Sequence, residues 1–245
     1  MKNAIILSLI VSATMATPVW AQSCKQLPSY DQLKAALTEA RKQDNGGLNQ
    51  DMWGAVVDRN GTVCAVAYTG ASLGDQWPGS RVIAAQKANT ANAFSLPNSA
   101  LSTANLYSGV QPGGFLYGIQ ESNPVDVSVA YKGPAGAYGS EKDSMVGHVL
   151  GGVNVFGGGL ALYNKDKKIL GAIGVSGDTS CADHNIAWRT RHALKLDYVP
   201  GGVSKDKNDQ IIYDIHLGKS LSGFGHPTCV ATEDKVADTL DKTAK

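Results

Sequence analysis

The stretch GGGLALYNKDKKILGAIGVSGDTSCADHNIA, residues 157–187, decides the fold. Its two apolar runs, 160–163 and 169–175, flank a short polar turn, a pattern that predicts a β-hairpin. Three residues that often cap helices follow it: Asp178, Thr179 and Ser180. A helix is therefore expected over 180–196, with Asp183 in its first turn, where the helix dipole favours a negative charge.

Upstream of this stretch, the sequence predicts a second hairpin and two helices. Residues 54–59 and 62–68 are rich in apolar and β-branched side chains, and the Asn60-Gly61 pair between them readily adopts the positive φ angles of a tight turn. Apolar residues at helical spacing predict a helix over 30–43. The alanine-rich run 80–94, which lacks glycine and proline, predicts another.

The other segments are less regular. We expect a short helix over 98–107, a strand over 210–217, and mainly loop with short strands over 108–159, which is rich in glycine, proline and serine. The resulting order is helix, hairpin, helices, hairpin, helix. This order predicts a single α+β domain with a central antiparallel sheet flanked by helices.

Charge and motif content exclude several function classes. The 245 residues contain 22 Lys and Arg against 21 Asp and Glu, so electrostatic capture of nucleic acid is not expected. The sequence has no Walker loop, no GxGxxG after a strand and no HExxH, which are signatures of common cofactor enzymes. Downstream of the N-terminal region, no segment is apolar for long enough to span a membrane.

The first 21 residues have the features of a secretory signal peptide. Lys2 supplies the positive start, residues 5–11 are apolar, and Val19-Trp20-Ala21 forms a small-x-small cleavage signal before Gln22. We therefore expect a periplasmic or secreted protein that begins at Gln22.

All four cysteines follow this cleavage signal, and an even number in an oxidising compartment favours disulfides. Four cysteines allow three pairings. We favour Cys24 with Cys64 and Cys181 with Cys229, because each bond would tie a terminal extension to the body of the domain.

Four blocks of sequence carry a resemblance to a known family: AVVDRNGTVCAVAYTG (55–70), SRVIAAQKANTANAF (80–94), YGIQESNP (117–124) and the opening stretch (157–187). Together they resemble the haem-binding protein and GlcG family, also called the haem-degrading domain family. The most specific part is the run 171–177 followed by Asp183. The resemblance implies an α+β fold with a central antiparallel sheet, assembly into homo-oligomers, and binding or slow degradation of haem.

The resemblance also maps positions onto this chain. Lys87, Thr90 and Asp183 match the family pattern, whereas Ala85 and Gln86 replace a common Arg-Asp pair and Ala161 replaces a common proline. The resulting division has four parts: a signal peptide (1–21), an N-terminal extension with the first helix (22–50), the family domain (51–196), and a C-terminal extension (197–245). Within the family domain, an insertion is expected at about 125–152.

A haem site needs an iron ligand, so the histidines are its first candidates. His184, Trp188 and His192 have i, i+4, i+8 spacing, which places them on one face of the predicted helix, where they would line a haem. The alternative is a surface or subunit contact without ligand. We favour His184 as the metal ligand because it follows Asp183 near the helix start. His148, in the glycine-rich loop region, is the alternative ligand.

A second candidate is the start of the same helix, whose free N–H groups would bind a propionate or another carboxylate. Its residues are Gly177, Asp178, Thr179 and Ser180. Lys87 would pair with such a carboxylate, whereas the alternative for this region is ordinary helix capping.

These features support three hypotheses. The first is an exported haem-binding protein that handles, senses or slowly degrades haem. The second is an enzyme or binding protein for a small organic acid, without haem. The third is a non-catalytic oligomeric accessory protein. The sequence identifies no catalytic residue.

Overall fold

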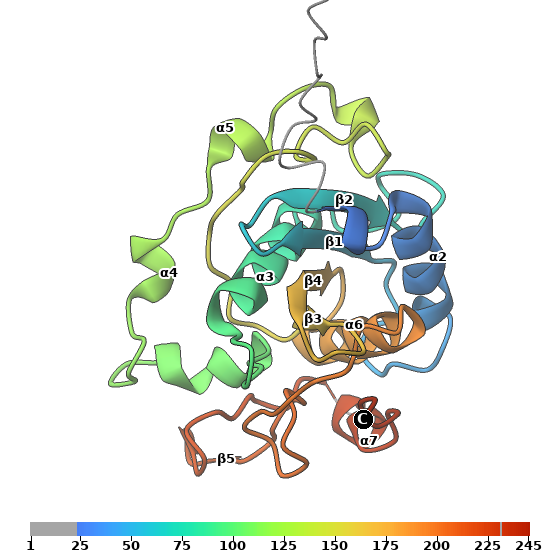
Figure 1. Cartoon of the computed structure of the whole chain (residues 1–245). Coiled ribbons are helices and arrows are strands. Elements are labelled where there is room, and N and C mark those ends of the chain that lie inside the picture. Colours follow the sequence, from blue (N-terminus) through green and yellow to red (C-terminus); the bar gives the residue numbers. More distant parts are fainter. Residues whose placement is uncertain (1–23, 231) are drawn as a thin grey trace, which may run out of the picture.

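A computed structural model describes residues 24–230 and 232–245, so the predicted signal peptide lies outside the described residues. Four antiparallel strands form its central sheet: β1 (Trp53–Asp58), β2 (Val63–Tyr68), β3 (Gly159–Tyr163) and β4 (Ile169–Ser176). Their order is β2-β1-β4-β3 (Figure 1). Both predicted hairpins are confirmed, and β1 joins them by pairing with β4.

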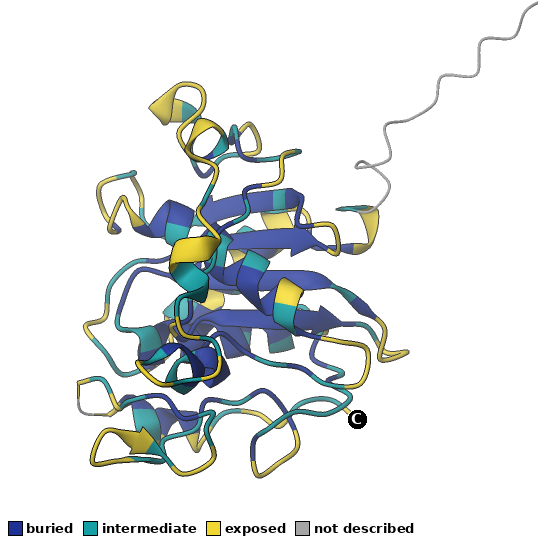
Figure 2. Ribbon diagram, turned by 90° about the vertical axis from the view of Figure 1, so that its left-hand side faces the viewer, coloured by how far each residue is buried: buried dark blue, intermediate teal, exposed yellow. Residues whose placement is uncertain are grey.

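Helices cover both faces of this sheet. The helix α3 (Ser80–Phe94) packs on one face, and α2 (Tyr30–Arg41) and α6 (Ser180–Ala193) pack on the other (Figure 1). Because side chains alternate along a strand, Val56 contributes to the core beneath α2 and α6 while Val57 contributes to the core beneath α3. Figure 2 shows that the central strands are buried along most of their length. The α+β prediction is confirmed.

The helix α3 approaches β4 very closely. A Cβ atom built on Gly174 would lie 1.9 Å from the carbonyl oxygen of Ala84 and 2.5 Å from the backbone nitrogen of Ala88. Glycine on the strand and alanine on the helix therefore allow this close packing, which fixes the position of Lys87 on α3.

The remaining elements are short. The helices are η1 (Cys24–Gln26), η2 (Ala104–Leu106), η3 (Ser108–Val110), α4 (Ile119–Ser122), α5 (Val127–Ala130), η4 (Ala135–Ala137) and α7 (Glu233–Ala237). The strands β5 (Ile215–His216) and β6 (Lys219–Ser220) pair in a separate small sheet. No helix among the described residues is long and apolar enough to cross a membrane.

Three sequence predictions need correction. The helix expected over 98–107 is wrong, because only the 3-10 turn η2 forms there and the side chains of Ser102 and Asn105 bond to each other and to nearby backbone N–H groups. The strand expected over 210–217 is wrong except at 215–216. The region 108–159 is mainly loop, as expected, but its regular pieces are short helices and isolated bridges instead of short strands.

The C-terminal segment, residues 197–245, lies against α6 and below β3 in the view of Figure 1. The disulfide Cys181–Cys229 ties this segment to α6. The second disulfide, Cys24–Cys64, ties η1 to β2. Both favoured cysteine pairings are thus confirmed.

Candidate functional site

The buried face of α6 combines an imidazole, an indole and a guanidinium. His184, Trp188 and Arg191 have i, i+4, i+7 spacing and almost no exposed surface. The rings of His184 and Trp188 are 6.0 Å apart between centroids, and the Arg191 guanidinium lies 4.7 Å from the centre of the Trp188 ring. The C-terminal segment covers this face, which we call the α6 face.

His184 is a neutral imidazole in the folded protein. Burial, and after it the positive charge of Arg191, hold the pKa of His184 well below its usual range. Its Nε2 accepts the N–H of Ile211 at 3.2 Å, so the single ring proton resides on Nδ1. That Nδ1 has no hydrogen-bond partner in the described part of the chain. A neutral imidazole with its lone pair on Nε2 is the form that ligates metals.

Arg191 makes a two-point ion pair with the C-terminal segment. Its two terminal nitrogens lie 2.7 and 2.8 Å from the carboxylate oxygens of Asp209, and both side chains are completely buried. The Nε of Arg191 has no partner within residues 24–230 and 232–245. Sequence reasoning missed Arg191, although its position seven residues after His184 places it on the same helix face.

The other residues predicted on this helix have separate contacts. Trp188 donates its indole N–H to the carbonyl oxygen of Asp241 at 2.8 Å. His192 is partly exposed, and its Nδ1 lies 2.8 Å from the carboxylate of Asp197, so it lies outside the buried α6 face. His148 is exposed on the loop before β3, far along the chain from this helix.

Lys87 and Asp183 form a buried ion pair between α3 and α6. The distance from Lys87 Nζ to Asp183 Oδ2 is 2.7 Å, and the other carboxylate oxygen accepts the N–H of Asp178 at 2.9 Å. Burial raises the pKa of Asp183 to about 6, although the Lys87 ammonium opposes this shift. Lys87 therefore does pair with a carboxylate, but with one from its own chain.

The start of α6 is capped by the chain itself. Thr179 Oγ1 accepts the N–H of Ala182 at 3.2 Å, and the Thr179 hydroxyl donates to the Glu233 carboxylate at 2.8 Å. The N–H of Cys181 points to the Sγ atom of Cys229 at 3.2 Å. These contacts occupy hydrogen-bond donors at the start of α6 that were candidates, from the sequence, for binding an anion.

The remaining residues of that turn have structural contacts too. A Cβ atom on Gly177 would lie 2.4 Å from the carbonyl oxygen of Asp51, so the backbones meet there. The Asp178 carboxylate accepts three backbone N–H groups, from Leu48 at 2.7 Å, Gln50 at 2.8 Å and Thr179 at 2.6 Å. The Ser180 hydroxyl lies 3.5 Å from Cys229 Sγ. The observed arrangement is that of a capped helix.

His226 enters the same region from the C-terminal segment. Its ring centroid lies 5.1 Å from that of Tyr107, and its Nε2 accepts the N–H of Gly157 at 3.4 Å. Burial lowers the pKa of His226 to about 4, so this imidazole is neutral as well. The protein thus encloses two neutral histidines beside α6, one on the helix and one on its cover.

No curated protein sequence matches the chain, but several solved structures are similar to it. Among solved structures, the chain is similar to PduOC in its complex with haem, at 26% identity over 68% of this chain and 91% of that one, with a TM-score of 0.47. It is similar to Klebsiella pneumoniae ORFY, at 22% identity over 76% and 97%, with a TM-score of 0.44. It is also similar to a double mutant of Streptomyces reticuli HbpS, at 17% identity over 79% and 98%, with a TM-score of 0.42.

The family comparison covers the domain from α2 to α6. The model of the family described as haem degrading protein HbpS-like matches residues 30–191, two thirds of the chain, and stops before the C-terminal segment. By this match, the chain belongs to the HbpS-like family of haem-degrading proteins.

Proposed function

We propose that the chain is an exported haem-binding protein whose haem site is the α6 face. Membership of the HbpS-like family supports haem as the ligand. In this assignment His184 Nε2 would hold the iron, Arg191 would pair with a propionate, and Trp188 would contact the ring. Bound haem would supply a redox-active iron at this face.

The observation that carries this proposal is what the C-terminal segment places there. Its Asp209 carboxylate occupies Arg191, and two residues later its Ile211 N–H occupies the lone pair of His184 Nε2. A haem propionate would pair with Arg191 through a carboxylate, as Asp209 does. A haem iron would use the lone pair of His184 Nε2, which the Ile211 N–H now uses. In this proposal, the described arrangement is a closed form of the site, in which the segment would substitute for the ligand.

The polar groups left over on this face support the same assignment. His184 Nδ1 and Arg191 Nε are both buried donors without a partner in the described residues. Leaving such a donor unpaired costs about 1–3 kcal/mol. The docked C-terminal segment therefore satisfies only some of the hydrogen-bonding groups on the α6 face. We assign the propionate to Arg191 instead of the turn at 177–180, because a guanidinium can make two parallel hydrogen bonds to one carboxylate.

A hemin titration tests the assignment. We expect wild-type protein to give a saturable Soret shift, and His184→Ala to bind hemin at least about tenfold more weakly with a displaced Soret maximum, because the axial nitrogen is lost. The matched control is His148→Ala, which removes the alternative histidine at an exposed position and should titrate like wild type. Unchanged affinity and Soret position in His184→Ala would remove that residue as the ligand.

A small organic acid is the second candidate ligand, because the group now bound to Arg191 is itself a carboxylate. A specific acid that displaces Asp209 without haem would raise the melting temperature, and at one concentration a tighter-binding acid would raise it more. Thermal-shift measurements with small carboxylates, in protein that fails to bind hemin, separate this candidate from a non-catalytic accessory role.

The proposed export predicts where the mature chain begins. The two disulfides fit an oxidising compartment, and the cleavage signal at 19–21 predicts a mature chain that begins at Gln22. Intact-mass measurement of protein recovered from the periplasm or medium should give residues 22–245. A mass that retains residues 1–21 would contradict export by this signal.

Self-association is also part of the proposal. Large apolar side chains are exposed along the loop region that leads to β3, among them Phe115, Tyr117, Val127, Tyr131 and Val149. Exposed apolar side chains are available for subunit contacts. We expect light scattering at micromolar concentration to give a mass above that of one chain. A monomer mass would rule out stable self-association.

A further inference from the structure

We propose that Cys181–Cys229 is a redox-active disulfide, which exchanges with an external dithiol, and that its reduction loosens the C-terminal segment from the α6 face. The surroundings of the two sulfurs support the exchange reaction, whatever ligand the protein binds. Only the effect of reduction on hemin binding rests on the proposed function.

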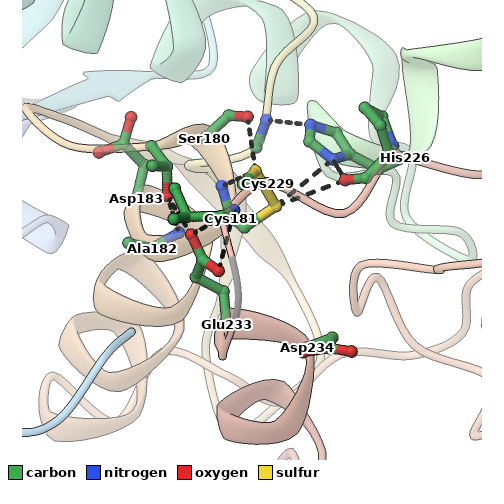
Figure 3. Close-up of a disulfide and its surroundings, with 12 residues drawn as sticks. Ser180, Cys181, Ala182, Asp183, His226, Cys229, Glu233 and Asp234 are labelled. Carbon is green, nitrogen blue, oxygen red and sulfur yellow. Dashed lines mark hydrogen bonds between the residues drawn. A yellow bond between two sulfur atoms is a disulfide. The ribbon is translucent and has the colours of Figure 1, made fainter. Parts of the chain in front are cut away.

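Hydrogen-bond donors surround the sulfur of Cys229. It accepts the backbone N–H of Cys181 at 3.2 Å and lies 3.5 Å from the Ser180 hydroxyl (Figure 3). Both donors belong to the first turn of α6, a helix of 14 residues whose dipole is positive at this end. These groups stabilise a thiolate on Cys229, and stabilising the thiolate favours the reduced state.

His226 lies beside the other sulfur, that of Cys181. Its Nε2 accepts from the N–H of Gly157 and its Nδ1 lies 2.7 Å from the carbonyl oxygen of Pro227, so the ring proton is on Nδ1. This Nδ1 is 3.8 Å from Cys181 Sγ, and Figure 3 shows the ring turned toward the disulfide. Cys181 is completely buried and its sulfur lies 3.4 Å from the carbonyl oxygen of Pro227, which also accepts the His226 Nδ1–H, so the thiolate is stabilised chiefly on Cys229.

The other disulfide lies beside a carboxylate. A carboxylate oxygen of Asp58 and the two sulfurs of Cys24–Cys64 all lie within 4.8 Å of one another. A carbonyl oxygen lies near one sulfur in both disulfides, so the carboxylate is the difference between them. Its negative charge disfavours a thiolate, so this bond is expected to resist reduction. The chain therefore contains its own control for the proposal.

Exposure determines which sulfur is attacked. Cys229 is partly exposed between the exposed residues Thr228 and Val230, whereas Cys181 has no exposed surface. A thiolate of the dithiol attacks Cys229 Sγ, the disulfide bond breaks, and its electron pair leaves on Cys181 Sγ. The second thiolate of the dithiol then attacks the dithiol's own sulfur in the mixed disulfide and releases the Cys229 thiolate. The dithiol supplies two electrons and becomes a disulfide.

Reduction would change how firmly the C-terminal segment is held. The bond joins residues 48 positions apart, and the segment it ties down carries both Asp209 and Ile211. Loss of a cross-link over a loop of this length is expected to raise the ratio of released to docked segment by about a hundredfold to a thousandfold. The remaining contacts, above all the Arg191–Asp209 pair, keep most molecules closed.

The first experiment compares the two disulfides of the intact mature chain. The protein is equilibrated in dithiothreitol redox buffers, and each cysteine pair is quantified by alkylation and mass spectrometry. We expect Cys181–Cys229 to be reduced at a dithiol-to-disulfide ratio at least about tenfold lower than Cys24–Cys64 requires. In Ser180→Ala, which lacks the hydroxyl donor to Cys229 Sγ, the required ratio should rise for Cys181–Cys229 and stay unchanged for Cys24–Cys64. Reduction of both bonds together, or of Cys24–Cys64 first, would overturn the redox assignment.

The second experiment tests the release of the segment. Amide hydrogen exchange over 205–230 and hemin affinity are measured in Cys181→Ser/Cys229→Ser, with Cys24→Ser/Cys64→Ser as the matched control. Faster exchange together with tighter hemin binding in the first variant alone supports both the release and the haem site. Faster exchange without any hemin binding supports the release and contradicts the proposed function. Unchanged exchange contradicts the release, whatever the hemin affinity.

Discussion

Replacing Lys87 by methionine is expected to lower the free energy of unfolding by about 3–5 kcal/mol, because it leaves the Asp183 carboxylate buried without its cation. Methionine has nearly the same length and keeps an apolar stem of similar volume in the same place. Urea unfolding at pH 7 measures the loss. The double variant Lys87→Met/Asp183→Leu, in which neither charge is buried, should recover much of it.

The pH dependence of the same variant distinguishes an ionic from a packing effect. Burial already raises the pKa of Asp183 to about 6 in the wild type, and removal of Lys87 raises it further. A raised folded-state pKa means that stability is greatest below the unfolded pKa and is lost as the pH rises through the folded value. The deficit of Lys87→Met should therefore shrink when the pH is lowered from 7 to 5. An equal deficit at both pH values would show that only packing was lost.

Replacing Asp209 by asparagine is expected to have two opposite effects. It leaves Arg191 buried without a counter-charge, so the free energy of unfolding should fall by about 3–5 kcal/mol. It also frees the guanidinium proposed to bind a propionate, so hemin affinity should rise by about tenfold or more. The matched control is Asp206→Asn, an exposed carboxylate in the same segment, which should leave both quantities unchanged. A variant that is less stable but binds hemin no better would show that Asp209 does not compete with the ligand.

The sequence predicted the sheet well because its signals are local. The Asn60-Gly61 turn and the apolar runs on either side specify β1 and β2 without help from distant residues. The helix α3 ends at Phe94 as predicted, since Ser95 and Pro97 stop the pattern. The disulfide pairing was also predicted, from the idea that each bond secures a terminal extension.

The C-terminal segment could not be predicted in the same way. Residues 210–217 have the composition of a strand, but the segment finds hydrogen-bond partners other than a neighbouring strand. The carbonyl of Gln210 accepts from Asn105, the N–H of Ile211 donates to His184, and the carbonyl of Ile212 accepts from the N–H of His226. These contacts join residues that are distant in sequence, and no local pattern encodes them.

The candidate site was predicted only in part for the same reason. Helical spacing placed His184 and Trp188 on one face, but their burial depends on Asp209, Ile211 and Asp241, which come from the C-terminal segment. His192 lies just beyond the region that this segment covers and remains partly exposed. Periodicity thus identifies a helix face, whereas the tertiary cover decides which of its residues form a site.

The exchange rate of the Ile211 amide tests the central claim most directly. In the closed form this N–H donates to His184 Nε2, the nitrogen proposed to ligate the haem iron. Iron and Ile211 cannot use the same lone pair, so saturating hemin should abolish the hydrogen bond and speed the exchange of this amide. The predicted result is a loss of protection at Ile211 when the protein is saturated with hemin. Full protection at Ile211 in a hemin-saturated protein would contradict the assignment of the α6 face as the haem site.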